Sequence, residues 1–119
     1  MKAKLGGAMG EAYTAEYFRR KKYDILAMNY KTRLGELDVI AANRKKLVFI
    51  EVKLRKSGSM ISGAEAVGRA KQKRLRAAAE LWMASHGEYT NRETSFTVAE
   101  IYLSQDGEVE EFNLIENAF

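Results

Sequence analysis

The chain has 119 residues with a net charge of +4, and 46% of them are hydrophobic, which predicts a single domain over residues 1–119 with its own core. It contains no cysteine and one histidine, which excludes a disulfide framework, a thiolate or histidine-rich metal site and a cysteine nucleophile. The absence of any apolar run near the roughly 18 residues of a membrane span, and of a signal-peptide pattern at the start, predicts a cytoplasmic protein.

The first half of the chain predicts one helix followed by three strands. Apolar residues recur at three-to-four spacing over residues 7–21, which is typical of an amphipathic helix. Strands are expected at 23–30, 36–42 and 47–54, and the polar residues 43–46 form a short turn between the last two. The segment 47–54 is almost continuously apolar, so we expect a central strand that is covered on both faces.

The second half predicts one more helix and a last pair of elements. Residues 57–63 are rich in serine and glycine and predict a loop, and helical spacing follows over 64–85. Residues 94–103 alternate as a strand, and 109–115 predict a short strand paired back on it or a helix. The whole order predicts an α/β fold, with an α-β-β-β-α-β core whose mixed central sheet is flanked by helices.

Two charged residues interrupt the most apolar strand. Glu51 and Lys53 are two positions apart, so both project from the same face of the strand. Ionised groups are rarely buried unless they are paired or bind a metal, so this placement has an energetic cost. One explanation is a functional site, and the alternative is a partly buried ion pair or a strand end that reaches solvent.

The preceding strand adds a second carboxylate. A hairpin through residues 43–46 pairs residue 42 with residue 47, and in that register Asp38 falls opposite Glu51. Two carboxylates so close are destabilising unless a cation joins them, and oxygen ligands suit Mg²⁺ or Mn²⁺. Asp38, Glu51 and Lys53 therefore predict a site for metal-assisted phosphodiester hydrolysis, in which Lys53 orients water or stabilises the phosphate. The alternative is that Lys53 only neutralises the two carboxylates.

The pattern Asp38, Glu51-x-Lys53 after a helix carrying Glu11 resembles the PD-(D/E)xK, restriction-endonuclease-like superfamily. Blocks over nearly the whole chain are similar to the bacterial YraN family: Gly10-Glu11, Gly35-Glu36-Leu37-Asp38-Val39-Ile40-Ala41, Leu47-Val48-Phe49-Ile50-Glu51-Val52-Lys53-x-Arg55, Ala66-Val67-x-x-x-Lys71-Gln72-x-x-Leu75 and Ala118-Phe119. That family is regarded as nuclease-like and close to archaeal Holliday-junction resolvases. The resemblance therefore implies a nuclease fold and, as in small resolvases, a homodimer.

The resemblance also implies a set of site residues. The implied catalytic residues are Glu11, Asp38, Glu51, Lys53 and Gln72. Glu11 would approach from the first helix as a ligand of the metal or of water, and Gln72 would come from the second helix, near the metal or the phosphate. Glu36 is expected on the face of Asp38 but one pleat away, behind the ligands themselves.

Two positions depart from the pattern. Leu37 stands where the superfamily has a proline before the aspartate, which is a common variation. Thr97 follows Phe96 where the YraN family usually has an aspartate after a phenylalanine. The second departure removes a polar group from the strand that follows the long helix.

The charges are distributed unevenly along the chain. Residues 1–76 hold 19 of the 20 basic and 7 of the 16 acidic residues, a net charge of +12, which predicts a surface that faces a polyanion. The expected backbone-phosphate contacts are Lys31, Arg33, Arg55, Lys56, Arg69, Lys71, Lys73 and Arg74. Nothing in the sequence predicts base reading, so we expect recognition of DNA shape. The alternative for 69–76 is a solvated helix face.

These observations support three hypotheses about function. The first is a Mg²⁺- or Mn²⁺-dependent endonuclease that acts on structured or branched DNA. The second is a non-catalytic DNA-binding module that keeps the fold, and the third is a protein-interaction subunit whose nuclease partner lies elsewhere. Metal-dependent cleavage of DNA would favour the first hypothesis. DNA binding that survives a chelator, without cleavage, would favour the second, and failure to bind DNA at low salt would favour the third.

Overall fold

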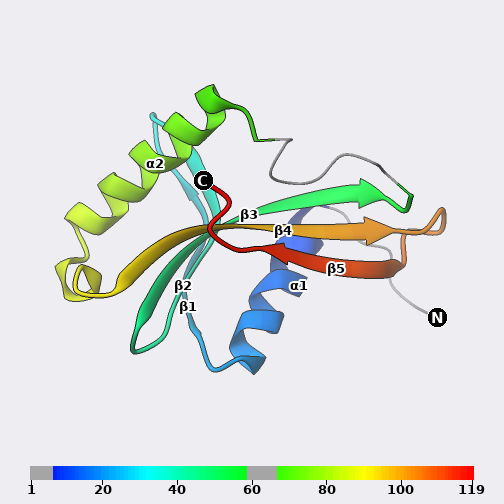
Figure 1. Cartoon of the computed structure of the whole chain (residues 1–119), viewed down its shortest axis with the longest axis horizontal. Helices are drawn as coiled ribbons and strands as arrows, with labels where there is room; N and C mark the ends of the chain where they lie inside the picture. Colours follow the sequence, from blue (N-terminus) through cyan, green and yellow to red (C-terminus); the bar gives the residue numbers. More distant parts are fainter. Residues whose placement is uncertain (1–6, 59–66) are drawn as a thin grey trace.

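The computed structural model describes residues 7–58 and 67–119. Its elements are α1 (Gly7–Arg20), β1 (Asp24–Lys31), β2 (Glu36–Ala42), β3 (Lys46–Lys56), α2 (Arg69–Ala84), the short 3-10 helix η1 (Gly87–Tyr89), β4 (Glu93–Leu103) and β5 (Val109–Ile115). The five strands form one sheet in the order in which they occur in the chain (Figure 1). Strands β3 and β4 are parallel and the other neighbours are antiparallel, which confirms the predicted mixed α/β fold.

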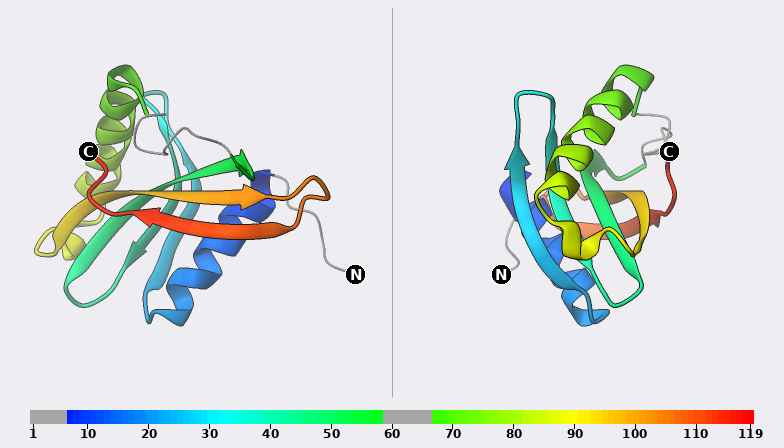
Figure 2. Two further views of the ribbon diagram at one scale, coloured as in Figure 1. Left: turned by 45° about the vertical axis from the view of Figure 1, so that its right-hand side comes forward. Right: turned by 90° about the vertical axis from the view of Figure 1, so that its left-hand side faces the viewer.

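The two helices cover opposite faces of the sheet (Figure 2). Strand side chains alternate between the faces, so β3 supplies both layers of the core. Phe49 packs towards α2, where its ring meets Trp82 edge-on at 6.1 Å, and Ile50 packs in the layer that holds Phe18 of α1. Because a parallel strand pair needs a crossover connection, α2 lies between β3 and β4 in the chain. The predicted central strand is confirmed.

The C-terminal segment completes the sheet and returns to the core. The segment 109–115 is a strand, so the strand alternative is the correct one. After β5, the Ala118 N–H donates to the Phe96 carbonyl at 2.9 Å, and the Phe119 ring stacks on Phe96 at 4.8 Å. The tail therefore crosses the end of β4 and packs beside α2.

Two predicted boundaries differ from the structure by two residues or more. In the described part of the chain the second helix begins at Arg69 and not at residue 64, because Gly68 before it is extended (φ −70°, ψ 166°). Most of the predicted loop 57–63 and the first residues of the predicted helix, 64–66, lie outside the described ranges. Strand β3 continues to Lys56 because its hydrogen-bonded pairing with β4 extends that far. Among the described helices, none is long and apolar enough to cross a lipid bilayer.

Candidate active site

The candidate site begins where the regular ladder between β2 and β3 stops. The predicted register is confirmed, because Ala42 pairs with Leu47 and the ladder continues to Val39 and Ile50. At the next position the Val52 N–H donates to Asp38 Oδ2 at 2.7 Å. A side-chain carboxylate thus satisfies a strand N–H group, and Asp38 is held at the point where the two strands separate.

The ladder between β1 and β2 is interrupted at the same place. Asn29 and Asp38 stand between two regular pairs, and Asn29 has a left-handed backbone (φ 53°), a conformation that asparagine tolerates better than most residues. Its side-chain amide donates to the carboxylate of Glu11 on α1. An edge strand and the first helix are therefore tied together next to Asp38, as the sequence pattern requires for a site that uses Glu11.

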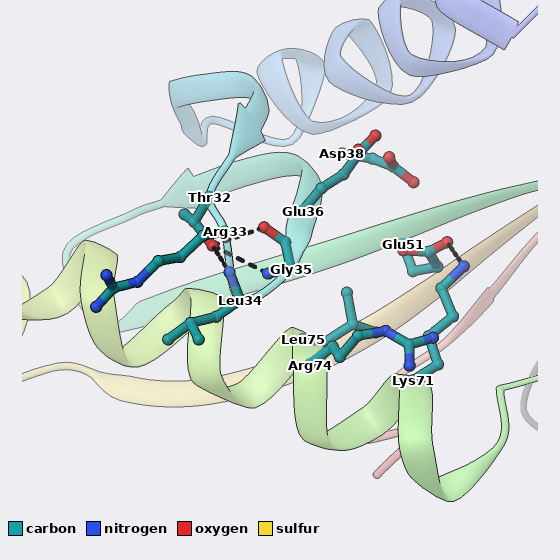
Figure 3. Close-up of a pocket in the computed structure, with 10 residues that line it drawn as sticks. All are labelled: Thr32, Arg33, Leu34, Gly35, Glu36, Asp38, Glu51, Lys71, Arg74 and Leu75. Atoms are coloured by element: carbon teal, nitrogen blue, oxygen red, sulfur yellow. Dashed lines mark hydrogen bonds and ion pairs between the residues drawn. The ribbon is translucent and has the colours of Figure 1, made fainter.

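A cleft of about 350 Å³ opens beside this break (Figure 3). Its lining comes from the β1–β2 turn, β2, β3 and α2: Thr32, Arg33, Leu34, Gly35, Glu36, Asp38, Glu51, Lys71, Arg74 and Leu75. Six of these are residues that the sequence predicted for the site or for phosphate contacts. The structure thus brings acidic groups from β2 and β3 into one cleft with basic groups from the turn and from α2.

The turn that walls the cleft is built by a residue that the sequence analysis missed. Thr32 Oγ1 accepts the N–H groups of Leu34 and Gly35, both at 3.0 Å, and donates to the Gly35 carbonyl at 2.8 Å. A Cβ at Gly35 would lie 2.4 Å from the Arg74 carbonyl oxygen, so the turn packs directly on α2. The sequence pattern that could have predicted this turn is a threonine three residues before a glycine, between two predicted strands.

Glu51 is the buried carboxylate of the site, with 8% of its surface exposed. Its Oε1 lies 2.7 Å from Lys71 Nζ and 3.6 Å from Lys53 Nζ. In Figure 3 this ion pair with Lys71 lies on one side of the cleft and the carboxylates of Glu36 and Asp38 on the other. The sequence placed Lys71 with the phosphate contacts, and the structure places it on Glu51.

The two lysines on Glu51 respond differently to their surroundings. The pKa of Lys53 is lowered, first because the side chain is half-buried and second because the Lys71 ammonium lies beside it. Burial is the largest single influence on Lys71 and lowers its pKa, but the contacts with Glu51 and Lys53 and the charges of Glu51 and Asp38 together outweigh burial, and the pKa is raised. Lys71 is thus the firmly charged partner of Glu51, and Lys53 is the group that releases a proton more readily.

Negative charge is crowded on the β2 side of the cleft. The pKa of Asp38 is raised to about 7, first by burial and then by the charge of Glu51, against the opposing effect of the Val52 N–H. Burial also raises the pKa of Glu11, and the contacts with Asn29 and Asp38 oppose that rise. These hard oxygen donors, which resist ionisation without a counter-charge, fit a divalent cation such as Mg²⁺ or Mn²⁺.

The acidic groups do not already form a complete ligand set. Within residues 7–58 and 67–119, no three acidic or histidine side chains are close enough to hold a metal ion together. Asp38 and Glu51 face the same cleft, but Glu51 Oε1 contacts Lys71. A bound ion would therefore compete with Lys71 for this oxygen or use the other oxygen of Glu51.

Gln72 and Thr97, which the sequence analysis singled out, lie outside the cleft lining. The Gln72 amide donates to the Val67 carbonyl at 2.9 Å, next to the start of α2. Thr97 is buried on the α1 side of β4, in a small hollow that it shares with Phe18 and Val48. The departure from the family pattern at Thr97 therefore lies beside Ile50, on the opposite face of the sheet from the contact between Glu51 and Lys71.

The predicted phosphate contacts divide into two groups. Arg33, Lys71 and Arg74 line the cleft. The others lie outside its lining, on element ends: Lys31 at the end of β1, Arg55 and Lys56 at the end of β3, and Arg69 and Lys73 in the first turns of α2. All of these are exposed except Arg55, which is half-buried and whose Nε and Nη2 atoms lack a hydrogen-bond partner.

Comparison with known proteins identifies relatives over the full length. The model of the uncharacterised protein family UPF0102 matches residues 10–115. A UPF0102 protein of Caldicellulosiruptor bescii is 36% identical over 119 residues, which is 100% of both chains. One of Alkaliphilus oremlandii is 39% identical over 115 residues (95% of this chain, 96% of the relative), and one of Agrobacterium fabrum is 48% identical over 82 residues (69% and 66%). The matches confirm the predicted resemblance to the YraN family.

Proposed function

The chain belongs to the UPF0102 family, and we propose that it is a metal-dependent endonuclease of the PD-(D/E)xK, restriction-endonuclease-like type. It would hydrolyse phosphodiester bonds of structured or branched DNA. One observation carries the proposal: Asp38 and Glu51 line the same basic cleft, where burial and the charge of Glu51 raise the pKa of Asp38 to about 7. Perturbed carboxylates in a cleft are a physical mark of an active site.

The chain's own residues can divide the work of hydrolysis. Asp38, Glu51 and Glu11 would hold Mg²⁺ or Mn²⁺, which when bound polarises a phosphate oxygen and lowers the pKa of water. The hydrogen bond from Val52 fixes the orientation of the Asp38 carboxylate. Lys53, with its lowered pKa, is suited to take a proton from the attacking water or to stabilise charge on the phosphate.

The basic walls of the cleft support a nucleic-acid substrate. Arg33 on the β1–β2 turn and Arg74 on α2 are both among the lining residues, so a phosphate backbone that crosses the cleft would find guanidinium groups from two elements. Such contacts position a backbone without reading bases. The proposed specificity is therefore for DNA shape.

A non-catalytic DNA-binding module is the second candidate. The observation that favours it is the contact between Lys71 and Glu51 at 2.7 Å, because a carboxylate that is already neutralised by lysine needs no metal. In this case the basic surface would bind DNA whether or not divalent ions are present.

Cleavage of labelled linear, flapped and four-way-junction DNA with Mn²⁺ or Mg²⁺ tests the proposal. We expect Glu51→Ala to lower the cleavage rate by at least about 100-fold. The matched control is Glu80→Ala, since Glu80 is an exposed acid on the same side of the sheet and outside the cleft, and its rate should match the wild type. Equal cleavage by the Glu51 variant would overturn the proposal, and DNA binding without any cleavage would favour the second candidate.

A further inference from the structure

A second basic hollow lies at the far end of the edge strand β1 from the cleft. The loop after α1 and the β2–β3 hairpin supply its lining, and in Figure 1 both lie at the lower ends of the strands, whereas the β1–β2 turn of the cleft lies beside α2. The hollow has a volume of about 320 Å³ and is lined by Lys21, Lys22, Asp24, Asn43, Arg44 and Lys45. We call these residues the hairpin patch. None of them was among the predicted phosphate contacts.

The backbone of the hairpin patch is held in place from both sides. Asn43 Oδ1 accepts the N–H groups of Lys45 and Lys46 at 2.9 and 2.8 Å, which shapes the hairpin turn. On the other side the Lys22 N–H donates to the Arg19 carbonyl at 3.0 Å and closes α1. Two rigid turns therefore present exposed cationic side chains across one hollow.

The charge of the hairpin patch is strongly positive. Four cations line it against the single carboxylate of Asp24. The nearest acid on α1 is Glu16, which already contacts Arg19 and Arg20 at 3.7 and 3.4 Å. None of the described lining residues is aromatic, so the hollow offers charge for phosphates and no ring for base stacking. These features suit a phosphodiester backbone.

The spacing along β1 relates the hairpin patch to the cleft. The strand runs from Asp24 at the patch to Lys31 near the cleft, seven residues or about 23 Å at roughly 3.3 Å per residue. Phosphates on one strand of a duplex are about 3.4 Å apart along the axis, so this length corresponds to about seven nucleotides. Strand β1 is an edge of the sheet, and Met28 and Asn29 are exposed along it.

We propose that the hairpin patch is a second phosphate-binding surface, and that one DNA duplex runs along β1 from the patch to the cleft. The inference rests on the proposed nuclease function and defines its substrate further. The substrate would be a duplex arm at least about eight base pairs long next to the cleavage point. A shorter arm would reach the cleft but not the hairpin patch.

The test compares two duplex lengths in a chelating buffer. Fluorescence anisotropy would measure binding of tetraloop-capped DNA with stems of 6 and 16 base pairs. We expect K22E/K45E to weaken binding of the long stem about 10-fold or more. The slope of the logarithm of the binding constant against the logarithm of the salt concentration should fall by an amount that corresponds to about two phosphate contacts. Binding of the short stem should change less than about twofold, because that stem does not reach the patch.

Two further variants make the result specific. Arg33→Glu, which changes the cleft wall, should weaken both stems, and the neutral K22Q/K45Q should show the same length dependence with a smaller loss. Thermal melting by circular dichroism would check that each variant is folded, which we expect because Lys22 and Lys45 are exposed.

Each of the other outcomes overturns the inference in a distinct way. Unchanged binding of the long stem by K22E/K45E, or equal losses on both stems, would overturn the second surface and leave the nuclease proposal standing. Failure of the wild type to bind either stem at low salt would overturn both. Binding of the patch to phosphatidylserine vesicles, without any effect on the long stem, would assign it to a membrane surface instead.

Discussion

Strands β2 and β3 form two regions with opposite properties. From Val39 to Ala42 and from Leu47 to Ile50 the ladder is regular and each side chain is at most 4% exposed. One residue further, at Asp38 and Glu51, the ladder ends and charged groups take over. The difference shows that apolar burial stabilises the paired part of the two strands. The site lies where the hydrogen-bonded pairing of β2 with β3 ends.

The two regions should also differ in how they respond to change. In the regular region a lost side chain leaves a cavity, whereas at the charged end the main energies are those of desolvated carboxylates and their counter-charges.

The largest effect is expected in the regular region. Phe49 is 1% exposed and packs against Trp82 and Phe96, so Phe49→Ala should lower the free energy of unfolding by about 3–5 kcal/mol. Urea denaturation measures the change. A loss below about 1 kcal/mol would contradict the assignment of this ring to the core.

The wall of the cleft should be the next most sensitive point. Gly35→Ala would place a methyl group 2.4 Å from the Arg74 carbonyl oxygen, and because this oxygen belongs to the backbone of α2 and cannot rotate away, we expect a loss of about 2–3 kcal/mol. Gly68→Ala is the matched control, since its Cβ would meet nothing within 4 Å and its φ is −70°. Its stability should stay within about 0.5 kcal/mol of the wild type.

The charged end predicts a pH dependence. The pKa of Asp38 is about 7 in the folded protein and near 3.8 when unfolded, so between these values the folded state binds the extra proton. Without divalent ions, this group's contribution to stability should therefore fall as the pH rises from about 4 to 7. Because Asp38 is partly exposed, solvent screening reduces the effect, and we expect about 1 kcal/mol.

Asp38→Asn separates this contribution from other titrations. The amide oxygen can still accept the Val52 N–H, and no charge forms at high pH. Chemical denaturation at pH 5 and pH 8 should show a smaller decline for the variant than for the wild type. Identical declines in the two proteins would remove Asp38 as the cause.

The smallest effect is expected for Lys71, which forms an ion pair with Glu51. Lys71→Met removes the ammonium that lies 2.7 Å from Oε1, so under the nuclease proposal the affinity for Mn²⁺ should rise by about fivefold. Titration followed by electron paramagnetic resonance measures free Mn²⁺. Lys73→Met, an exposed lysine of the same helix, is the matched control and should leave the affinity unchanged. An unchanged affinity in the Lys71 variant would show that the ion does not use this oxygen.

The order of the elements and the register of the central hairpin could be predicted from the sequence alone. Both depend on local patterns: residues 47–54 are nearly all apolar, and a short polar turn at 43–46 leaves little freedom in how residue 42 meets residue 47. The same period of two placed Glu51 and Lys53 on one face, and the structure confirms that they are in contact.

Only the tertiary structure decided how the site is completed. The contacts from Asn29 to Glu11, from Lys71 to Glu51 and from Gly35 to α2 join residues that are 18 or more positions apart. No local period relates such residues, because their approach depends on how the helices pack on the twisted sheet and on where the ladders stop. The local sequence pattern therefore places the carboxylates and Lys53 on their strands, and packing brings Lys71 to Glu51 and Asn29 to Glu11.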